Sequence, residues 1–242
     1  MINVLMAMAG KSSFFDSPEY QFPKPLVEIR GKTMVQWAIE NYQSIQEPIR
    51  FIFVVRSADC SRFHLDNILK LLTQDQAVIV RLDKETRGAA CSALMAVDCI
   101  QNDSPLIIAN SDQVIEEDLN GILKNFRERD LDAGVICFET VHPRWSYVRL
   151  DENDHVIEAA EKRPLSRHAV AGFYYFKKGS DFVRAAMKSI EKDAQVDGSY
   201  YVAPTLNELI LENRKLGIYQ IQEAKYHTLY SPQKIKEFED NR

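Results

Sequence analysis

The first residues of the chain, Met1-Ile2-Asn3-Val4-Leu5-Met6-Ala7-Met8-Ala9-Gly10-Lys11-Ser12-Ser13, form an apolar run that ends in a small polar loop. The run is short and has no basic leader of the kind that signal peptides carry, so it predicts a buried strand over Val4–Met8. No apolar stretch in the chain approaches the ~20 residues that a membrane helix needs. We therefore expect a cytoplasmic protein without a membrane partner.

Outward from this strand, short apolar runs alternate with amphipathic stretches. Further strands are predicted at Phe51–Val55, Val78–Leu82, Leu106–Ala109 and Gly134–Phe138. Apolar residues at helical spacing predict helices at Met34–Ile45, Arg62–Leu72, Ala89–Ile100 and Leu119–Arg129. This alternation is typical of an α/β fold with a mostly parallel central sheet and helices on both faces.

The pattern changes in the later part of the chain. From Trp145 to Phe176 it predicts three strands, with a turn at Asp151–Asp154, which fits antiparallel strands added at one end of the sheet. The elements expected after these strands are two helices, a strand and a last short helix, at Ser180–Lys192, Ala203–Asn213, Gly217–Gln222 and from Ser231-Pro232 onward. No repeat or Pro/Gly/Ser linker interrupts the pattern, so one domain over residues 1–242 is expected.

The composition excludes several classes of protein. The 242 residues carry 35 acidic and 30 basic side chains, a formal net charge of -5, and only 9 glycines. This composition excludes collagen-like and low-complexity proteins, and the length allows a substantial core. The acidic balance disfavours a protein that coats nucleic acid, because such binding depends on clustered Lys and Arg. The four cysteines have no Cys-x-x-Cys spacing, so we expect reduced thiols and no zinc or redox pair.

The loop Ala9–Ser13 follows a strand that should lie at the centre of the sheet. In open α/β sheets, ligands bind beyond the carboxyl ends of the strands. Backbone amides of such a loop can hold a phosphate, and Gly10 has no Cβ to block its approach. An ordinary turn explains this glycine equally well, so the loop alone does not decide between a phosphate site and a turn.

A longer block that begins at Pro23 changes this balance. Its sequence over residues 23–34 is P-K-P-L-V-E-I-R-G-K-T-M. It resembles the second half of the signature of the sugar-phosphate nucleotidyltransferases, which reads P-K-x-L-x-x-[IV]-x-G-K-P-[ML]. Further matches follow in family order at Glu85–Ala90, Ile107–Asp112, Glu161–Pro164 and Val170–Phe176. The resemblance spans roughly residues 2–230 and is strongest for the subgroup encoded with capsule and surface-polysaccharide genes.

This resemblance implies both a fold and an activity. The fold would be the three-layer, Rossmann-like, glycosyltransferase-A type, with a nucleotide-binding half at 1–140 and an acceptor-binding half at 141–242. The activity would be Mg²⁺-dependent transfer from a nucleoside triphosphate to a sugar phosphate or another small phosphorylated precursor, with release of pyrophosphate. The attacking phosphate oxygen is already ionised, so the protein would position reactants and neutralise charge. We expect no nucleic-acid partner, and a homo-oligomer is compatible with the sequence.

The resemblance also implies roles for individual residues. The residues that would contact the nucleotide are Ala7, Ala9, Gly10, Lys11, Arg87, Gly88 and Ala89. The catalytic residues would be Lys24 on the triphosphate, Asp112 on Mg²⁺ and Lys162 on the acceptor phosphate. The acceptor would be bound by Asn110, Glu161 and Gly172. The second metal ligand would be Asn207 or Asp197.

Four of these residues also have purely structural explanations. An Asp that follows an apolar strand, as Asp112 does, either holds Mg²⁺ or makes an ordinary turn. Lys24 suits a triphosphate as a compact charge, or it is a solvated surface lysine. Glu161 either accepts hydrogen bonds from the acceptor or pairs with a neighbouring arginine. Gly172 either lets the acceptor approach the backbone or marks a bulge in a strand.

Two positions depart from the family pattern. The signature G-x-G-[ST]-R would place an arginine where this chain has Phe14 or Phe15, so the arginine that binds the triphosphate is missing. Lys11 or Arg87 would supply only part of its charge, because neither position reproduces the planar fork in that loop. Pro204 stands near the position of a second metal-binding Asp.

These departures keep two alternatives open. One is a non-catalytic regulator or subunit that binds a nucleotide or a sugar phosphate. The other is a glycosyltransferase on the same fold, which is less expected. Such enzymes usually need an Asp-x-Asp pair, whereas Gln113 and Val114 follow Asp112 here.

Overall fold

The strand predicted at the start of the chain lies in the middle of a sheet. The computed structural model describes residues 1–10, 12, 14–15 and 20–240, so Lys11 lies outside the described residues. Strand β1 (Ile2–Ala7) pairs in parallel with β4 (Ile49–Arg56) on one side and with β6 (Leu106–Ala109) on the other. Both edges of β1 are therefore hydrogen-bonded, and helices can cover both of its faces.

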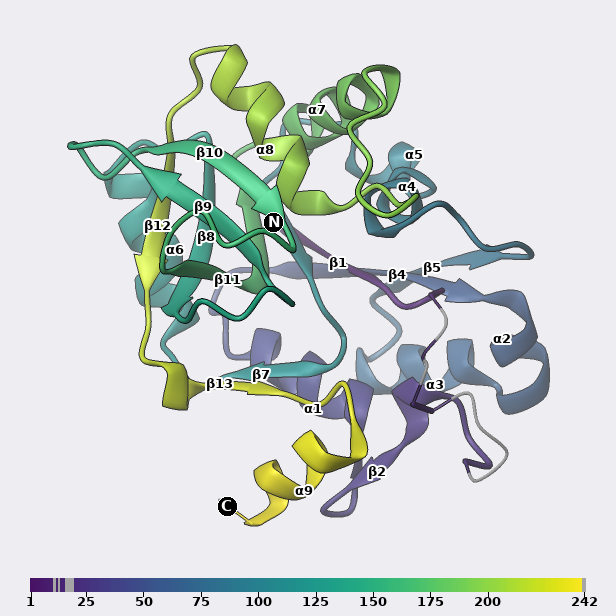
Figure 1. Cartoon of the computed structure of the whole chain (residues 1–242). Coiled ribbons are helices and arrows are strands. Elements are labelled where there is room, and N and C mark those ends of the chain that lie inside the picture. The colour runs from purple at the N-terminus through teal and green to yellow at the C-terminus, as the bar shows by residue number, and fades with distance from the viewer. Residues whose placement is uncertain (11, 13, 16–19, 241–242) are drawn as a thin grey trace.

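Nine strands within the described part of the chain form one mixed sheet (Figure 1). The other strands are β5 (Ala77–Leu82), β8 (Ala133–Glu139), β9 (Ser146–Leu150), β10 (Val156–Glu161), β11 (His168–Phe176) and β12 (Leu216–Gln220). The order is β10-β9-β11-β6-β1-β4-β5, and β8 pairs with both β11 and β12. Strand β11 runs antiparallel to β6, β8 and β9, whereas β1, β4, β5 and β6 are parallel. The predicted mixed, mostly parallel α/β sheet is confirmed.

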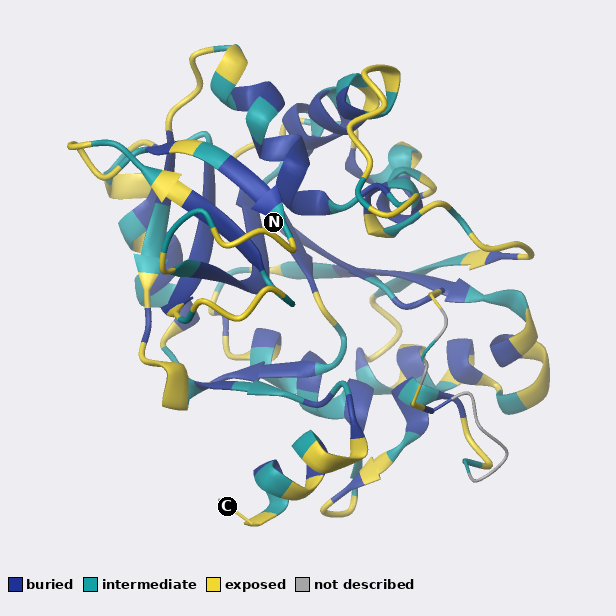
Figure 2. Ribbon diagram, viewed as in Figure 1, coloured by how far each residue is buried: buried dark blue, intermediate teal, exposed yellow. Residues whose placement is uncertain are grey.

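Helices on both faces of the sheet give three layers. One face carries α1 (Met34–Gln43), α3 (Leu65–Leu72) and α6 (Leu119–Glu128), and the other carries α4 (Ala89–Leu94), α7 (Gly179–Glu191) and α8 (Val202–Leu211). Side chains of β1 alternate between the two cores, since Val4 and Met6 belong to the first and Leu5 to the second. Figure 2 shows the resulting continuous burial of the central strands.

Two predicted helices are each divided in the structure. The helix predicted over Arg62–Leu72 is α2 (Ser57–Phe63) followed by α3, and His64 between them has φ 54, a left-handed conformation that ends a helix. The helix predicted over Ala89–Ile100 is α4 followed by α5 (Val97–Ile100). The apolar spacing continues across both breaks, which is why the sequence indicated single helices.

Short elements extend the fold beside the main sheet. Strand β7 (Gln113–Ile115) pairs antiparallel with β13 (Tyr226–Thr228), and helix α9 (Pro232–Asp240) follows β13 (Figure 1). The remaining elements are η1 (Lys24–Leu26), β2 (Glu28–Ile29), β3 (Lys32–Thr33) and η2 (Glu223–Lys225). Within the described residues, none of the helices combines the length and apolarity needed to span a membrane.

Candidate active site

Three adjoining hollows lie where β1 and β6 end. The central hollow is lined by Ala7, Gly10, Lys24, Arg56, Asn110 and Asp112 among others. The loop hollow is lined by Ala7, Gly10, Thr86, Gly88, Ala89 and Tyr201 among others. The aromatic hollow is lined by Asn110, Arg144, Trp145, Glu161, Tyr174, Tyr201 and Tyr226 among others. Because neighbouring hollows share lining residues, they form one cleft at the carboxyl edge of the sheet.

Lys24 and Asp112 meet in the central hollow. Lys24 begins η1, and Asp112 lies in the turn between β6 and β7. The distance from Lys24 Nζ to Asp112 Oδ2 is 2.5 Å, and the two side chains are 26% and 19% exposed. A ligand in the hollow can therefore reach both groups. The fold brings together two residues that lie in separate sequence motifs.

The block over residues 23–34 explains how Lys24 is held. Pro23 adopts an extended conformation before η1, with φ -66 and ψ 155. Gly31, at φ 77, makes the turn between β2 and β3. The Oγ1 atom of Thr33 accepts a hydrogen bond from the Gln36 amide at 3.3 Å and caps the start of α1. The motif thus reverses the chain and fixes Lys24 between α1 and the end of β1.

Backbone contacts shape the loop hollow around Gly88. The Ala90 amide donates to the Tyr200 carbonyl at 3.0 Å, and the Tyr200 amide donates to the Arg87 carbonyl at 2.7 Å. Gly88 has φ 107, and a Cβ built there would lie 2.4 Å from the Tyr200 carbonyl oxygen. The Arg87 guanidinium lies 5.2 Å from the centre of the Tyr200 ring. Gly88 is therefore required by packing, and Arg87 braces the same contact.

Gly10 differs from Gly88, because protein packing does not require a glycine there. A Cβ built on Gly10 would meet no atom of the described residues within 4 Å. We expect Gly10→Ala to change the free energy of unfolding by no more than roughly 0.5 kcal/mol, the range of neutral surface changes. For the nucleoside triphosphate that the sequence motifs imply, the KM of the variant should rise about tenfold, because Gly10 lines two of the hollows and the added methyl group would take up space there. Thermal denaturation and steady-state kinetics check the two halves of this prediction, and a fall in stability with unchanged KM would contradict it.

The aromatic hollow surrounds one carboxylate. The rings of Trp145, Tyr174, Tyr201 and Tyr226 line it. The Glu161 carboxylate accepts a hydrogen bond from Ser146 Oγ, and Tyr174 OH donates to the same Oγ at 3.3 Å. Burial raises the pKa of Glu161 above 4.5, against the opposing effects of Ser146 and the Lys162 charge. The hollow thus offers apolar walls and one poorly solvated acceptor.

Gly172 places β11 against the turn that carries Asp112. Its φ is 57, and a Cβ there would lie 2.3 Å from both Asn110 Nδ2 and Gln113 Oε1. The Gly172 carbonyl accepts from the Asn110 amide at 3.2 Å and from Gln113 Nε2 at 2.9 Å. Gly172 lies at the register shift where β11 pairs with β8, so it marks a bulge and also lines the aromatic hollow.

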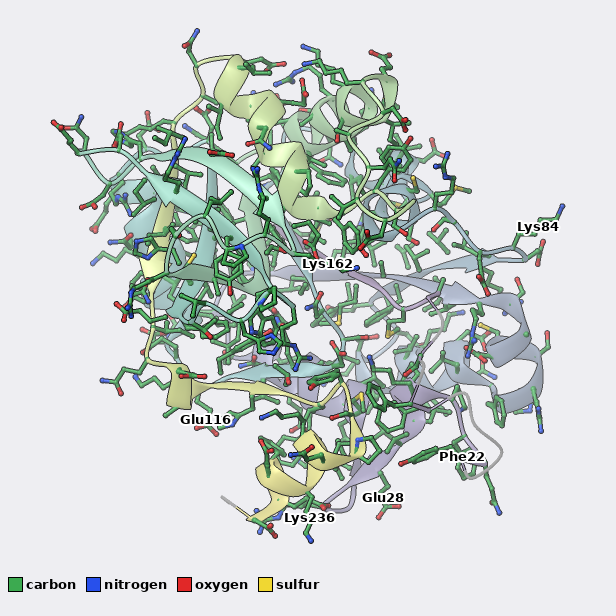
Figure 3. The ribbon with its side chains drawn as sticks, viewed as in Figure 1. Phe22, Glu28, Lys84, Glu116, Lys162 and Lys236 are labelled. Atoms are coloured by element: carbon green, nitrogen blue, oxygen red, sulfur yellow. The ribbon has the colours of Figure 1, made fainter. Side chains whose placement is uncertain are left out.

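Lys162 follows the last residue of β10 (Figure 3). Its Nζ lies 3.1 Å from Asp197 Oδ2 and 5.2 Å from the centre of the Tyr201 ring. Contact with the Tyr201 side chain, and then with Asp197, raises the pKa of Lys162 above its ordinary value. Lys162 is therefore a stable cation beside a ring that lines two of the three hollows.

Asn207, the predicted second metal ligand, has both polar atoms of its side chain hydrogen-bonded to the backbone. Its Oδ1 accepts from the Ala159 amide at 2.8 Å, and its Nδ2 donates to the Ala159 carbonyl at 2.8 Å. Both polar atoms of the amide thus attach α8 to β10. Asp197, the alternative ligand, pairs with Lys162. Neither residue lies among those that line the central hollow with Asp112.

Two arginines in the cleft were not predicted. Arg56 ends β4 and lines the central hollow, whereas Arg144 lines the aromatic hollow. The Arg144 guanidinium lies 3.7 Å from the centre of the Tyr230 ring and 4.7 Å from that of Trp145. The position of Arg56 directly after a predicted strand was the available signal. No pattern in the sequence predicts that Arg144 lies in the cleft.

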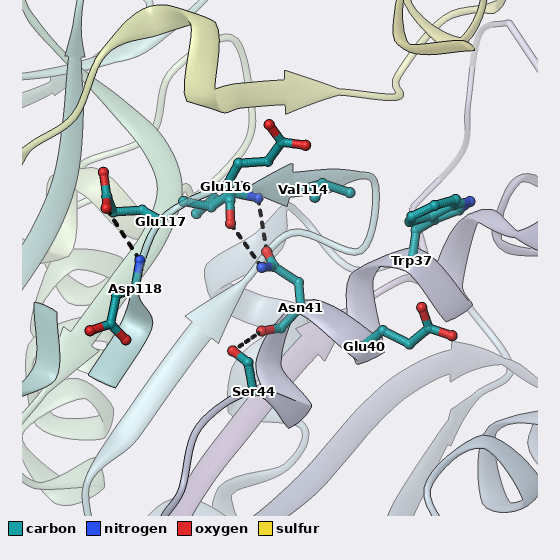
Figure 4. Close-up of a pocket in the computed structure, with 9 residues that line it drawn as sticks. Trp37, Glu40, Asn41, Ser44, Val114, Glu116, Glu117 and Asp118 are labelled. Atoms are coloured by element: carbon teal, nitrogen blue, oxygen red, sulfur yellow. Dashed lines mark hydrogen bonds between the residues drawn. The ribbon is translucent and has the colours of Figure 1, made fainter. Parts of the chain in front are cut away.

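A larger cavity of about 450 Å³ lies elsewhere, between α1 and β7 (Figure 4). Its acidic lining residues are Glu40, Glu116, Glu117 and Asp118. Each carboxylate already has a partner: in the same order, Lys32, His227, Lys225 and the Asn120 amide. Two hydrogen bonds between the Asn41 amide and the Ile115 backbone, at 2.8 and 2.9 Å, close its inner wall. Because the acidic side chains that line this cavity are already paired within the protein, we do not take it as the candidate site.

Comparisons with known proteins identify relatives of this chain. The bifunctional protein GlmU of Methanocaldococcus jannaschii is 25% identical over 220 residues, which are 90% of this chain and 49% of that protein. The chain therefore spans about half the length of the curated relative that it matches.

Solved structures show the same fold. The nucleoside-diphosphate-sugar pyrophosphorylase from Vibrio cholerae has a TM-score of 0.85 at 23% identity, covering 99% of this chain and 100% of that one. The inositol-1-phosphate CTP transferase from T. maritima has a TM-score of 0.74 at 13% identity, covering 96% and 90%. At these identities the likeness concerns the fold alone. The family model for nucleotidyl transferases matches residues 20–217. Because this match covers most of the chain, the protein belongs to the nucleotidyl transferase family.

Proposed function

We propose that this protein transfers a nucleotide from a nucleoside triphosphate to a small phosphorylated acceptor and releases pyrophosphate. The observation that carries the proposal is the Lys24–Asp112 pair, 2.5 Å apart in the central hollow, which shares lining residues with each of the other two. The loop hollow would hold the base and ribose, and the aromatic hollow would hold the acceptor. Reaction at the α-phosphorus would then take place beside Lys24 and Asp112.

The residues present fit one shared Mg²⁺ ion. Mg²⁺ usually binds one or two carboxylates together with substrate phosphates and water. The central hollow supplies the Asp112 carboxylate, and the described residues contain no cluster of three or more His, Cys, Asp and Glu side chains that would enclose a metal. The donor set therefore suits an ion shared with the triphosphate. Bound there, Mg²⁺ would neutralise phosphate charge.

The chain's own residues would act by position and charge. An ionised oxygen of the acceptor phosphate forms a bond to the α-phosphorus, and the bond from that phosphorus to the bridging oxygen of the β-phosphate breaks. Pyrophosphate leaves with the electron pair, so no proton needs to move to a base. Lys24 would hold the triphosphate from the central hollow, and Lys162 would hold the acceptor phosphate.

The acceptor-binding half would lie within residues 141–242. Glu161 would accept a hydrogen bond from an acceptor hydroxyl, in a hollow whose rings suit the apolar face of a sugar or a similar ligand. We propose a precursor of surface polysaccharide as the acceptor, because the motifs resemble the capsule-associated subgroup. The UDP-glucose pyrophosphorylase in complex with UDP-glucose, which has a TM-score of 0.77, shows the same fold with a sugar nucleotide bound.

The test measures pyrophosphate release. Purified protein with Mg²⁺ is offered each of the four common nucleoside triphosphates with a panel of sugar, polyol and amino-alcohol phosphates. Release that requires both substrates supports the proposal. Thermal stabilisation by a nucleotide without any turnover would instead favour a non-catalytic regulator, since ligands that bind only the folded state raise stability. The buried Phe15 near the signature arginine's position, 2% exposed, motivates that second arm.

Glu161→Gln should change stability in a pH-dependent way. The folded protein holds the Glu161 pKa above 4.5, so the protonated form adds stability that is fully present below pH 4.5 and lost as pH rises through the folded pKa. The uncharged glutamine avoids this loss. We expect the variant to melt higher than the wild type at pH 8, with the difference shrinking toward pH 4, and to have a raised KM for the acceptor. Thermal scans across pH check this, and a variant less stable at pH 8 would contradict it.

A further inference from the structure

The missing signature arginine leaves a deficit of charge near the triphosphate. Phe15 lies in an apolar cluster with Ile29, Val114 and Leu229. Phe14 contacts the edge of Tyr230, with ring centres 5.9 Å apart. Neither side chain can bind a phosphate. A cation from elsewhere in the fold must neutralise the triphosphate together with Lys24.

Arg56 lies where such a cation is needed. It ends β4, which runs parallel to β1 in the register Ala7↔Val54, and the Met8 amide donates to the Val54 carbonyl at 2.7 Å. Arg56 therefore emerges beside the loop that follows β1. It lines the central hollow together with Gly10, Lys24 and Asp112.

The guanidinium of Arg56 is also oriented by the fold. Its Nε donates to Asp59 Oδ2 at 2.8 Å, and Asp59, in the first turn of α2, is 5% exposed. The Arg56 side chain itself is 26% exposed. Asp59 thus fixes the Nε edge of the Arg56 guanidinium, and the partly exposed side chain lines the central hollow. An oriented guanidinium is suited to bidentate contact with phosphate oxygens.

We propose that Arg56 binds the β- and γ-phosphates of the nucleoside triphosphate and replaces the signature arginine, with Asp59 as its positioning residue. This inference rests on the proposed function. In this proposal the positive charge comes from β4, the strand beside β1. The phosphate site is then kept although Phe14 or Phe15 stands where the signature has an arginine.

The experiment compares Arg56→Met and Arg56→Lys with the wild type. Arg56→Met should weaken triphosphate binding about 10- to 100-fold, as expected for the loss of charge-assisted hydrogen bonds, and leave the affinity for the nucleoside monophosphate unchanged. Arg56→Lys should retain part of the binding, because the charge remains and the fork is lost. Asp59→Asn should raise the KM for the triphosphate less than Arg56→Met does, with kcat close to that of the wild type.

Arg62→Met is the matched control. Arg62 lies on α2, its guanidinium is 4.9 Å from the centre of the Phe63 ring, and it does not line the central hollow. It should bind and turn over substrates as the wild type does. Circular dichroism and thermal scans confirm that each variant is folded. If Arg56→Met proves unstable, Arg56→Lys supplies the comparison.

Inorganic tripolyphosphate separates failure of this inference from failure of the proposed function. Binding of tripolyphosphate to the wild type, weakened in the folded Arg56 variants, supports the phosphate site even if no nucleotide transfer is observed. Equal binding of triphosphate and tripolyphosphate by the wild type and Arg56→Met would overturn the inference. Failure of the wild type to bind tripolyphosphate would overturn it too, whatever the turnover.

Discussion

Asp112→Asn should reduce kcat for pyrophosphate release by about 10²- to 10³-fold, the range seen when one preorganised electrostatic contact to a transition state is removed. The substitution keeps the shape of the side chain and removes its charge. It leaves Lys24, which lies 2.5 Å from Asp112 Oδ2, without its counter-charge. It also removes the one carboxylate that the described residues of the central hollow offer to Mg²⁺. Steady-state assays over a range of Mg²⁺ concentrations measure both effects.

A matched control for Asp112→Asn is Glu117→Gln. Glu117 lies beyond the other end of β7 from Asp112, and it pairs with Lys225 at 2.7 Å outside the cleft. Its removal should leave kcat close to that of the wild type, and folding of both variants is checked by thermal scans. A folded Asp112→Asn variant with wild-type turnover and an unchanged Mg²⁺ requirement would sink the assignment of Asp112 to the metal.

Gly88→Ala should cost about 3 kcal/mol of folding free energy, because a non-glycine residue in a glycine-only backbone region and a clash with backbone add together. The backbone φ of Gly88 is 107, and the new Cβ would approach the Tyr200 carbonyl oxygen to 2.4 Å. The oxygen cannot yield easily, since it accepts a hydrogen bond from Ala90. For a chain of this size, a melting temperature about 6–12 °C lower follows.

Urea or thermal unfolding measures the loss in Gly88→Ala. Gly10→Ala is the comparison for this loss of stability, because an added Cβ on Gly10 would meet no atom of the described residues within 4 Å. One glycine is required by the fold, and the other is expected to matter only when a ligand is present. Equal stability of the two variants would show that the contact between residues 87–90 and Tyr200 is not rigid.

The fold was largely predictable because the spacing of apolar residues along the sequence indicates which faces of the helices and strands are buried. The strands around β1 are mostly apolar, since helices cover both faces, and such runs are easily found in a sequence. The break at His64 was not predictable in the same way. It depends on a left-handed backbone at a residue that is neither Gly nor Asn, held there by the packing of α2 and α3.

The candidate site was predictable where it follows strand ends. Lys24 and Asp112 were assigned from motifs, and the fold places them in contact. The metal role of Asn207 stays a prediction. In the structure its amide attaches α8 to the backbone of Ala159, a tertiary contact that no local pattern reports. Arg56 was overlooked because its strand looked purely structural. Side chains that reach the site from neighbouring strands require knowledge of the strand order.

The pairing of β13 with β7 has a consequence for synthesis of the protein. The Leu229 amide donates to the Asp112 carbonyl at 2.7 Å, and Tyr226 OH donates to Gln113 Oε1 at 3.1 Å. The backbone beside the central carboxylate is thus fixed by residues translated more than a hundred positions later. On the ribosome, the sheet around β1 can assemble first, whereas the cleft stays incomplete until residues 226–229 emerge. Nascent chains should acquire their fold before they acquire a finished site.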